Sequence, residues 1–225
     1  MTSGRGAAAG NETVVATYDR LATAYDVLFA PMEAGTRAVA LDLLALDAGE
    51  RVLEVGCGPG RALTAMAARV GPSGRVVGVD AAPGMLARAR RHAERAAATD
   101  RVGLVRGDAR SIPVRDDAVT AAFVEDALEL FSPGEARAVL DEIGRALAPD
   151  GRLCVVTMER AGAGRDPFVR AYDWVYDHVP GYDRVGCRPV RARRWLETAG
   201  YRIARVEHRR RWGIWPTEIL LARPA

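Results

Sequence analysis

Lysine is absent from this 225-residue sequence: all 32 basic residues are arginine, and 29 acidic residues leave a formal charge of +3. A small positive charge spread along the chain is unlike the concentrated basic surface of nucleic-acid-binding proteins. Uncharged apolar runs of about 18 residues, the length of a membrane span, are also lacking. Residues 1–10 have no apolar core like that of a signal peptide. We therefore expect a cytoplasmic protein with no nucleic-acid partner.

Cysteine is scarce as well. Cys57, Cys154 and Cys187 are far apart and show none of the paired spacings that mark metal sites. In the expected compartment they should be reduced thiols with structural roles. The residues that are abundant, 49% hydrophobic over 225 positions, suit one α/β domain with a substantial core.

The most informative stretch is RVLEVGCGPG, residues 51–60, which predicts a buried strand running into a glycine-rich turn. Gly56, Gly58 and Gly60 allow the backbone to turn sharply and to approach a ligand closely. The helix that follows offers unpaired N–H groups and the positive end of its dipole. Dinucleotide loops have a wider spacing, G-x-G-x-x-G. Glu54 precedes the glycines here, and its carboxylate would repel a pyrophosphate but favour a ligand that carries positive charge.

Acidic residues stand at or after the end of each of the next three strands. Asp80 ends a strand and lies twenty residues after Gly60, the interval at which a carboxylate can accept both ribose hydroxyls; it could instead cap the next helix. Asp108 follows the third strand. Glu125-Asp126 follows the fourth, which borders the point where strand order reverses, so both acids should face a bound ligand unless they only cap the following helix.

The pattern E-x-G-x-G-x-G resembles motif I of class I S-adenosylmethionine (SAM) methyltransferases. The segment Gly107-Asp108-Ala109 is similar to the one with which this family holds adenine. The Tyr-Asp pairs at 18–19 and 25–26, together with Cys-Arg-Pro at 187–189, are similar to the ubiquinone/menaquinone-biosynthesis branch. The chain departs from the family pattern at Asp116-Asp117, where Phe-Asp is usual, and at 147–151, where Leu-Lys-Pro-Gly-Gly is usual.

The resemblance implies an α/β, Rossmann-like SAM methyltransferase fold: a seven-stranded, mostly parallel sheet with a C-terminal antiparallel hairpin and helices on both faces. We expect residues 1–11 to be disordered and 12–225 to form a single methyltransferase domain, with 12–48 as an N-terminal helical lid and 159–190 as a substrate-pocket insertion. Hydrophobic patterns predict helices at 13–29, 35–46, 61–69, 84–98, 133–147 and 190–199, strands at 75–79, 102–106, 117–124, 153–158, 201–208 and 217–223, and a tight turn at 147–153.

The resemblance also implies SAM as cofactor, S-adenosylhomocysteine as product, and no metal. The cofactor-binding residues that it predicts are Tyr18, Tyr25, Glu54, Gly56, Cys57, Gly58, Gly60, Asp80, Ala81, Met85, Gly107, Asp108, Ala109 and Glu125. The tyrosines could instead only anchor their helix, Met85 could be a core residue, and Cys57 suits packing better than chemistry.

On the acceptor side we expect His178, Glu125 and Tyr25 as catalytic candidates, because a phenolic or enolic acceptor must lose a proton. Substrate contacts are predicted at Asp126, Tyr172, Tyr176, His178 and Trp212. The aromatic residues could alternatively be a helical cap on the sheet, and the loop around Trp212 could touch a membrane.

The predicted function is methyl transfer, by in-line displacement, to a small aromatic or amphipathic metabolite, in a monomer or homodimer. The alternatives are a phospholipid head-group methyltransferase and a SAM-binding protein without methyl transfer.

Overall fold

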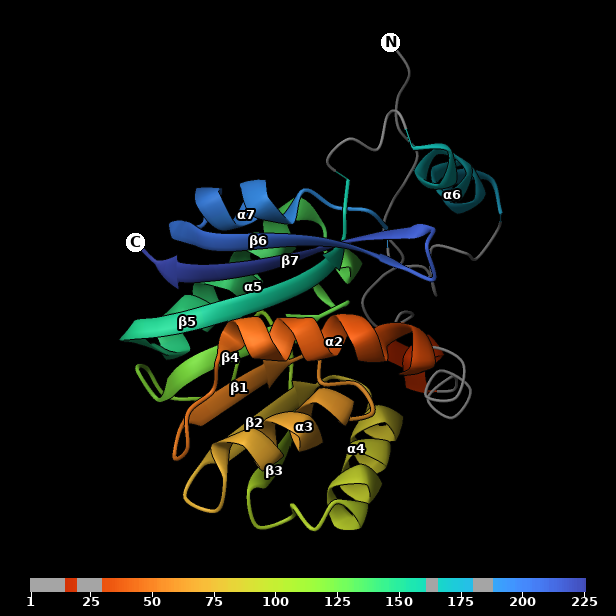
Figure 1. Ribbon diagram of the computed structural model, residues 1–225. Coiled ribbons are helices and arrows are strands. Elements are labelled where there is room, and N and C mark those ends of the chain that lie inside the picture. Colours follow the sequence, from red (N-terminus) through yellow and green to blue (C-terminus); the bar gives the residue numbers. More distant parts are fainter. Residues whose placement is uncertain (1–14, 20–29, 161–165, 180–187) are drawn as a thin grey trace.

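The computed structural model describes residues 15–19, 30–160, 166–179 and 188–225. Within them one seven-stranded sheet has the order β3-β2-β1-β4-β5-β7-β6 (Figure 1). Its strands are β1 Arg51–Val55, β2 Arg75–Asp80, β3 Val102–Arg106, β4 Val119–Glu125, β5 Leu147–Met158, β6 Tyr201–Arg211 and β7 Trp215–Pro224. Neighbours from β3 to β5 are parallel, whereas β7 is antiparallel to both β5 and β6. The predicted Rossmann-like sheet with an antiparallel C-terminal hairpin is confirmed.

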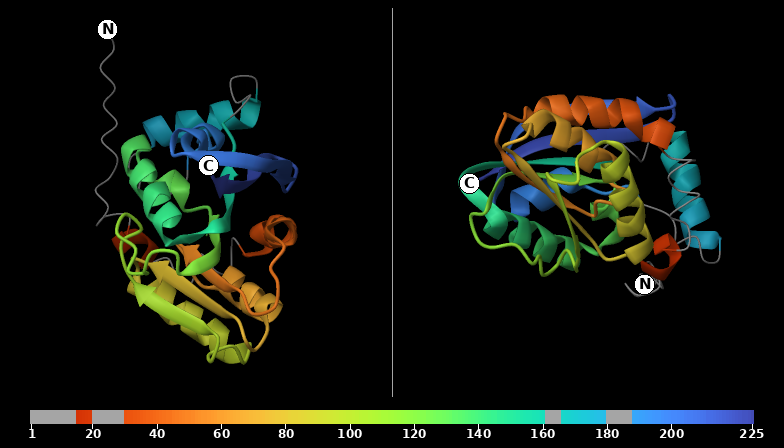
Figure 2. Two further views of the ribbon diagram at one scale, coloured as in Figure 1. Left: turned by 90° about the vertical axis from the view of Figure 1, so that its left-hand side faces the viewer. Right: turned by 90° about the horizontal axis from the view of Figure 1, so that it is seen from below.

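Helices cover both faces of this sheet (Figure 2). They are α2 Ala30–Leu44, α3 Arg61–Val70, α4 Pro83–Arg95, η1 Leu128–Leu130, α5 Pro133–Ala146, α6 Pro167–His178 and α7 Ala192–Thr198. Successive side chains of a strand point to opposite faces, and β4 shows this directly. Ala122 and Val124 pack in the core under α5 and α7, whereas Ala121 and Phe123 pack in the core under α2 and α3.

The start of α5 follows from its sequence. The Ser132 hydroxyl accepts a hydrogen bond from the Glu135 N–H at 3.4 Å, and the Glu135 carboxylate accepts one from the Ser132 N–H at 3.0 Å. This reciprocal pair is a capping box, and Pro133 occupies the first turn, where its missing N–H costs nothing. The predicted start of this helix at residue 133 is confirmed.

The predicted tight turn at 147–153 is wrong, because β5 already begins at Leu147. Val119 of β4 pairs with Leu147 and Ala121 pairs with Arg152, so the extra residues 148–151 lie opposite Thr120. The departure from the usual Leu-Lys-Pro-Gly-Gly sequence therefore forms an irregularity inside a strand.

Two helix boundaries also differ from expectation. α4 ends at Arg95 because Ala97 adopts a left-handed φ of 49°, which a helix cannot contain. α2 begins at Ala30, five residues before the predicted start, with Pro31 in its first turn. This additional turn carries Glu33 into the functional site. None of the helices in the described ranges is long and apolar enough to cross a bilayer.

Candidate functional site

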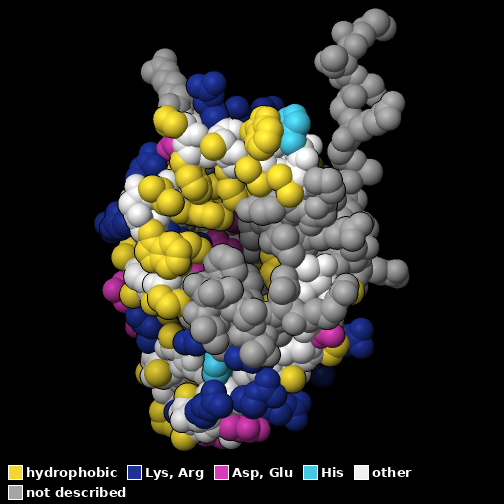
Figure 3. Space-filling model, turned by 90° about the vertical axis from the view of Figure 1, so that its right-hand side faces the viewer, with side chains coloured by type: hydrophobic (Ala, Val, Ile, Leu, Met, Phe, Trp, Pro, Cys, Tyr) yellow, Lys and Arg dark blue, Asp and Glu magenta, His cyan; other side chains and the backbone are white. Residues whose placement is uncertain are grey.

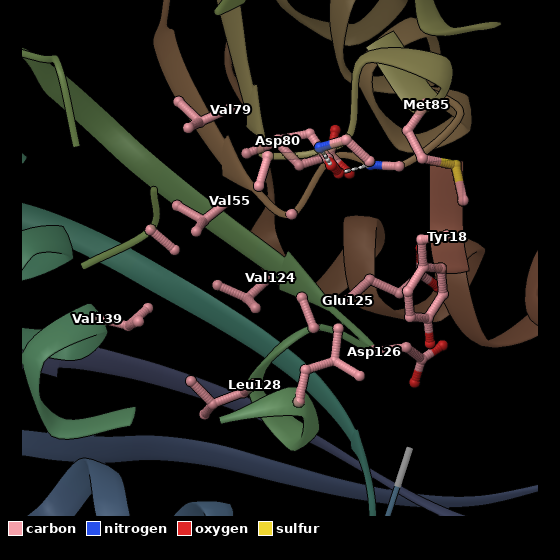
Figure 4. A pocket seen from close by; sticks show the side chains of 18 of the residues that line it. Tyr18, Val55, Val79, Asp80, Met85, Val124, Glu125, Asp126, Leu128 and Val139 are labelled. Atoms are coloured by element: carbon pink, nitrogen blue, oxygen red, sulfur yellow. Dashed lines mark hydrogen bonds between the residues drawn. The ribbon is translucent and has the colours of Figure 1, made fainter. Parts of the chain in front are cut away.

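A cavity opens beyond the carboxyl ends of β1, β2 and β4, next to the reversal of strand order between β1 and β4. Ligands of open α/β sheets bind at this position. Figure 4 shows Asp80 and Met85 on one side of the cavity and the apolar side chains of Leu128 and Val139 on the other. The predicted site residues that line it are Tyr18, Glu54, Gly56, Gly58, Asp80, Ala81, Met85, Gly107, Asp108, Ala109, Glu125 and Asp126.

The three loop glycines have different tasks. All have positive φ, but a Cβ on Gly56 would lie 2.5 Å from Ala127, and one on Gly60 would lie 2.7 Å from Ala89. Gly56 and Gly60 therefore permit close packing of the loop against its neighbours. A Cβ on Gly58 would meet nothing within 4 Å, and Gly58 lines the cavity. Gly58 is thus the point at which a ligand can approach the backbone.

Two predicted loop contacts lie outside the cavity lining. Gly60 precedes α3 and has a left-handed backbone conformation; its backbone packs against Ala89 of α4. The Cys57 side chain is only 4% exposed and packs in the core with Leu63. Burial raises the pKa of the Cys57 thiol, so this residue is an inert core thiol.

Asp80 holds the loop and faces the cavity (Figure 4). Its Oδ2 accepts from the Gly58 N–H at 2.8 Å and its Oδ1 accepts from the Ala82 N–H at 2.9 Å. Burial raises the pKa of the Asp80 carboxyl, and these hydrogen bonds oppose that rise. Met85 is 3% exposed and packs with Ala82 and Tyr18, yet it also lines the cavity. Met85 is therefore both a core residue and a part of the cavity wall.

The Asp108 carboxylate is engaged by the chain itself. Arg110 Nη2 donates to its Oδ2 at 2.7 Å and the Arg110 backbone N–H donates to its Oδ1 at 2.9 Å. The hydrogen bond from the Arg110 side chain lowers the pKa of Asp108. The other branch of that guanidinium donates to Glu135 at 2.7 Å. An adenine amino group at this position would share the Asp108 carboxylate with Arg110, which already donates to both of its oxygens.

Glu54, in β1 just before the glycine loop, has a carboxylate oxygen without a hydrogen-bond partner among the described residues. The residue is 3% exposed, and the oxygen concerned is Oε2. Burial, followed by the charge of Glu125, raises its pKa well above the usual value, while Arg37 lowers it. A buried carboxyl oxygen without a donor is costly. A cationic or N–H-bearing ligand in the cavity would satisfy it.

Glu125 and Asp126 lie at the end of β4 and belong to an ion-pair cluster that the sequence analysis missed. Arg37 of α2 donates to Glu125 Oε2 at 2.6 Å and to Glu33 Oε2 at 2.7 Å. Arg211, at the end of β6, donates to Asp126 Oδ2 at 2.5 Å. We call these five residues the ion-pair cluster. Its members come from α2, β4 and β6.

Sequence patterns near these five residues gave little indication of the ion-pair cluster. Glu33 and Arg37 are spaced by one helical turn in a segment otherwise rich in alanine and leucine, which was the one available clue. Arg211 ends a run of three arginines, of which Arg209 and Arg210 are exposed and Arg211 is only 4% exposed. Sequence spacing alone does not separate the buried arginine from its exposed neighbours.

Burial raises the pKa of the Glu125 carboxyl to about 7; the charges of Asp126 and Glu33 act in the same direction, and Arg37 and Arg211 oppose them. Glu125 Oε2 accepts from Arg37, whereas Oε1 has no hydrogen-bond partner among the described residues, with Arg211 Nη2 at 3.7 Å. A carboxyl poised near neutral pH with one unoccupied oxygen in a cavity is suited to accept a proton.

Glu129 gives the fold a pH dependence. Burial raises the pKa of this carboxyl to about 8; Oε1 accepts from the Met158 N–H at 2.7 Å, and Oε2 has no partner among the described residues. A pKa raised in the folded state contributes stability that is full below the unfolded value of about 4.3 and is lost as pH rises through about 8. The free energy of unfolding of the wild type should therefore fall between about pH 5 and 9.

In Glu129→Gln this decline should be shallower, because glutamine can still accept from Met158 but does not ionise. Urea unfolding at a series of pH values measures both slopes. Glu94→Gln, which changes an exposed acid on α4, is the control and should keep the wild-type slope. Equal slopes in Glu129→Gln and the wild type would assign the pH dependence to other groups.

The predicted acceptor residues on α6 and the β6–β7 turn do not line the cavity. Tyr172 packs on Trp215 with ring centroids 5.2 Å apart. Tyr176 is half-buried, whereas His178 is exposed, stacks on Trp174 at 4.9 Å and has its Nδ1 2.8 Å from the Trp174 carbonyl oxygen. The structure therefore gives His178 no contact with the cavity. Tyr25 lies outside the described residues.

Trp212 is 68% exposed at the β6–β7 turn, close in sequence to Ile214, which is 52% exposed. Trp212 has a left-handed φ of 50°, consistent with its place in a tight turn. Figure 3 shows hydrophobic side chains gathered beside a hollow on the face of the molecule that it presents. The predicted contact of Trp212 with a substrate stays a prediction.

A family model described as a methyltransferase domain matches residues 52–151, which include the loop, Asp80, Asp108 and the ion-pair residues of β4. A demethylmenaquinone methyltransferase of Clavibacter sepedonicus is 34% identical over 63% of this chain and 56% of its own length. A solved SAM-dependent methyltransferase from Aquifex aeolicus superposes with a TM-score of 0.62 at 22% identity, covering 83% of this chain and 88% of its own. Residues 52–151 are therefore similar to methyltransferase domains, and the chain has the fold of a solved SAM-dependent methyltransferase.

The chain is also similar to a nocamycin O-methyltransferase of Saccharothrix syringae, 38% identical over 60% of the chain and 48% of the relative. The chain spans about half the length of these two curated relatives. The predicted relation to the quinone-biosynthesis branch is confirmed. The cofactor of the family is SAM, and the cavity fits it in two respects: Gly58 leaves the backbone open to a ligand, and Glu54 offers an unsatisfied buried acceptor.

Proposed function

We propose that this protein transfers the methyl group of SAM to an acidic hydroxyl or enolic carbon of a small aromatic or amphipathic metabolite. One observation carries the proposal. The cavity that the glycine loop lines is also lined by Glu125 and by the apolar residues Leu128, Leu130 and Phe131. A ring-bearing acceptor suits such an apolar lining, and Glu125, whose Oε1 has no hydrogen-bond partner among the described residues, lines the same cavity.

The cofactor side would be held by the loop and the acids that follow it. Gly58 would offer its backbone, Asp80 would accept from the ribose hydroxyls, and Met85 would pack against the adenine. Glu54 would accept from the positively charged methionine portion of the cofactor. When bound, SAM supplies a sulfonium-activated methyl group for in-line displacement.

The chain contributes alignment, exclusion of water and proton transfer. Val55, Val124 and Leu128 form apolar walls (Figure 4), and a dry, shaped site accelerates a displacement by holding the reacting groups in line. Glu125 would take the proton of the acceptor on its Oε1. Arg37, which donates to Glu125 Oε2 at 2.6 Å, fixes the orientation of that carboxylate.

Release of S-adenosylhomocysteine in the presence of a panel of phenols, hydroxyquinones and enolic polyketides tests the transfer. We expect kcat/KM to rise with pH and to level off above about pH 7, because Glu125 must be ionised to act as a base. Glu125→Gln should lower kcat by about 10²–10⁴-fold and leave the Kd for SAM nearly unchanged. Glu94→Gln is the matched control on the surface.

Two outcomes would contradict the proposal. SAM binding without S-adenosylhomocysteine release across the panel would indicate a SAM-binding protein that does not transfer methyl groups. A Glu125→Gln variant with weakened SAM binding and unchanged kcat would show that Glu125 holds the cofactor and is not the base.

A further inference from the structure

Away from the cavity, three metal-ligand side chains meet where β5, β6 and β7 lie together. Glu159 directly follows β5, and its N–H donates to the Pro216 carbonyl of β7 at 3.0 Å. His208 of β6 pairs with Glu218 of β7 across the antiparallel ladder. One potential ligand atom from each of Glu159, His208 and Glu218 lies within 4.8 Å of the other two. None of the three lines the cavity.

Glu218 is the unexplained member of this group. The residue is only 3% exposed, and no hydrogen bond or ion pair reaches its carboxylate from the described part of the chain. Burial, followed by the charge of Glu159, raises its pKa, while His208 and Arg193 lower it. The other two members are already paired: His208 Nδ1 lies 2.9 Å from Glu159 Oε2. A second carboxylate, buried beside the first, requires either a proton or a cation for compensation.

We propose that Glu159, His208 and Glu218 bind a divalent metal ion of the zinc class. One imidazole nitrogen and two carboxylate oxygens are a ligand set that suits Zn²⁺, which takes three protein ligands and leaves a position for water. Mg²⁺ and Ca²⁺ prefer oxygen alone, so the imidazole argues against them. Two carboxylates and a neutral imidazole balance the charge of the ion.

The distances between the three ligand atoms are compatible with a zinc site after small side-chain movements. Zinc–ligand distances of about 2.0–2.2 Å place tetrahedral ligand atoms roughly 3.3 Å from one another. The three atoms here lie within 4.8 Å, and the His208 side chain, 58% exposed, is able to rotate toward the two carboxylates. Its exposure also gives the ion a route from solvent.

Such an ion would act on the fold rather than on the reaction. The next residue, Arg160, donates its N–H to the Val190 carbonyl at 3.0 Å and pairs with Asp173 of α6 at 2.8 Å. A metal at Glu159 would therefore fasten the end of β5, and through Arg160 the position of α6, to the β6–β7 hairpin.

Titration of the full chain, stripped with EDTA and dialysed, with Zn²⁺ at pH 7.5 in a calorimeter tests the site. We expect one ion per chain and a Tm that rises by several degrees at about 100 times Kd. His208→Ala and Glu218→Gln should each weaken binding at least tenfold and remove the Tm shift. Glu207→Gln, a half-exposed acid next to His208, and His178→Ala, an exposed histidine on α6, are the controls and should bind like the wild type.

Circular dichroism establishes that the variants are folded. Absence of stoichiometric Zn²⁺ binding to the wild type would overturn the proposal. Binding that survives both His208→Ala and Glu218→Gln would do the same. If Glu218→Gln raises Tm and Zn²⁺ shifts the Tm of no variant, the compensating species is a proton.

Discussion

Asp80→Ala is expected to weaken SAM binding by at least about 100-fold. The Asp80 carboxylate holds the loop through the Gly58 and Ala82 N–H groups, at 2.8 and 2.9 Å, and lines the cavity where the ribose would lie. Hydrogen bonds to charged groups contribute about 1.5–3 kcal/mol each. Each 1.4 kcal/mol is about tenfold in affinity. Loss of the loop anchor together with the ribose acceptor therefore predicts a loss of two or more orders of magnitude.

Calorimetric titration with SAM and with S-adenosylhomocysteine measures this effect. Asp80→Asn, which keeps one acceptor oxygen, should lie between the wild type and alanine. Asp100→Ala is the control, because the Asp100 side chain is 70% exposed and is not part of the cavity lining. Unchanged affinity in a folded Asp80→Ala protein would reject the role of Asp80 in binding the cofactor.

Arg211→Ala is expected to lower the free energy of unfolding by about 3–5 kcal/mol. Removing one partner of a buried ion pair leaves the opposite charge without compensation, and losses of this size are typical. The Arg211 side chain is 2% exposed and contacts Asp126 at 2.5 Å, Thr36 at 3.3 Å and Glu125 at 3.7 Å. Alanine would leave Asp126 buried without its cation.

Urea unfolding of the variant measures the loss. Arg209→Ala, on the same strand with a side chain 46% exposed, should change stability by no more than about 0.5 kcal/mol. The double variant Arg211→Met/Asp126→Asn should recover part of the loss, since it removes both charges. If Arg211→Ala and Arg209→Ala cost the same, the ion-pair cluster does not hold β4 and β6 together.

The sequence predicted the strand–loop–helix of residues 51–70 and the alternation of strands and helices after it. These features are local: a short apolar run, glycines that adopt positive φ, and a capping serine each act on neighbouring residues. Because the carboxyl ends of parallel strands meet at one edge, it also followed that Glu54, Asp80, Asp108 and Glu125 would gather there, and all four line the cavity.

Where the structure places a predicted site residue outside the cavity lining, the deciding contact is distant in sequence or depends on which face of an element is buried. Gly60 was expected to contact the cofactor, but its missing Cβ makes room for Ala89 of α4. His178 was expected as a catalytic residue because an imidazole can accept a proton near neutral pH, yet α6 presents it to solvent, stacked on Trp174. Residue type predicted what these side chains can do, and packing determined what they contact.

By itself, the sequence determined the fold class, the cofactor loop and the acids that face it, because periodicity, glycine conformation and strand order are encoded over short spans. Only the tertiary structure decided the electrostatics of the ion-pair cluster. Arg37 of α2 reaches Glu125 across 88 residues, and Arg211 of β6 reaches Asp126 across 85. Burial raises the pKa of the Glu125 carboxyl to about 7. Burial arises only once the chain has packed.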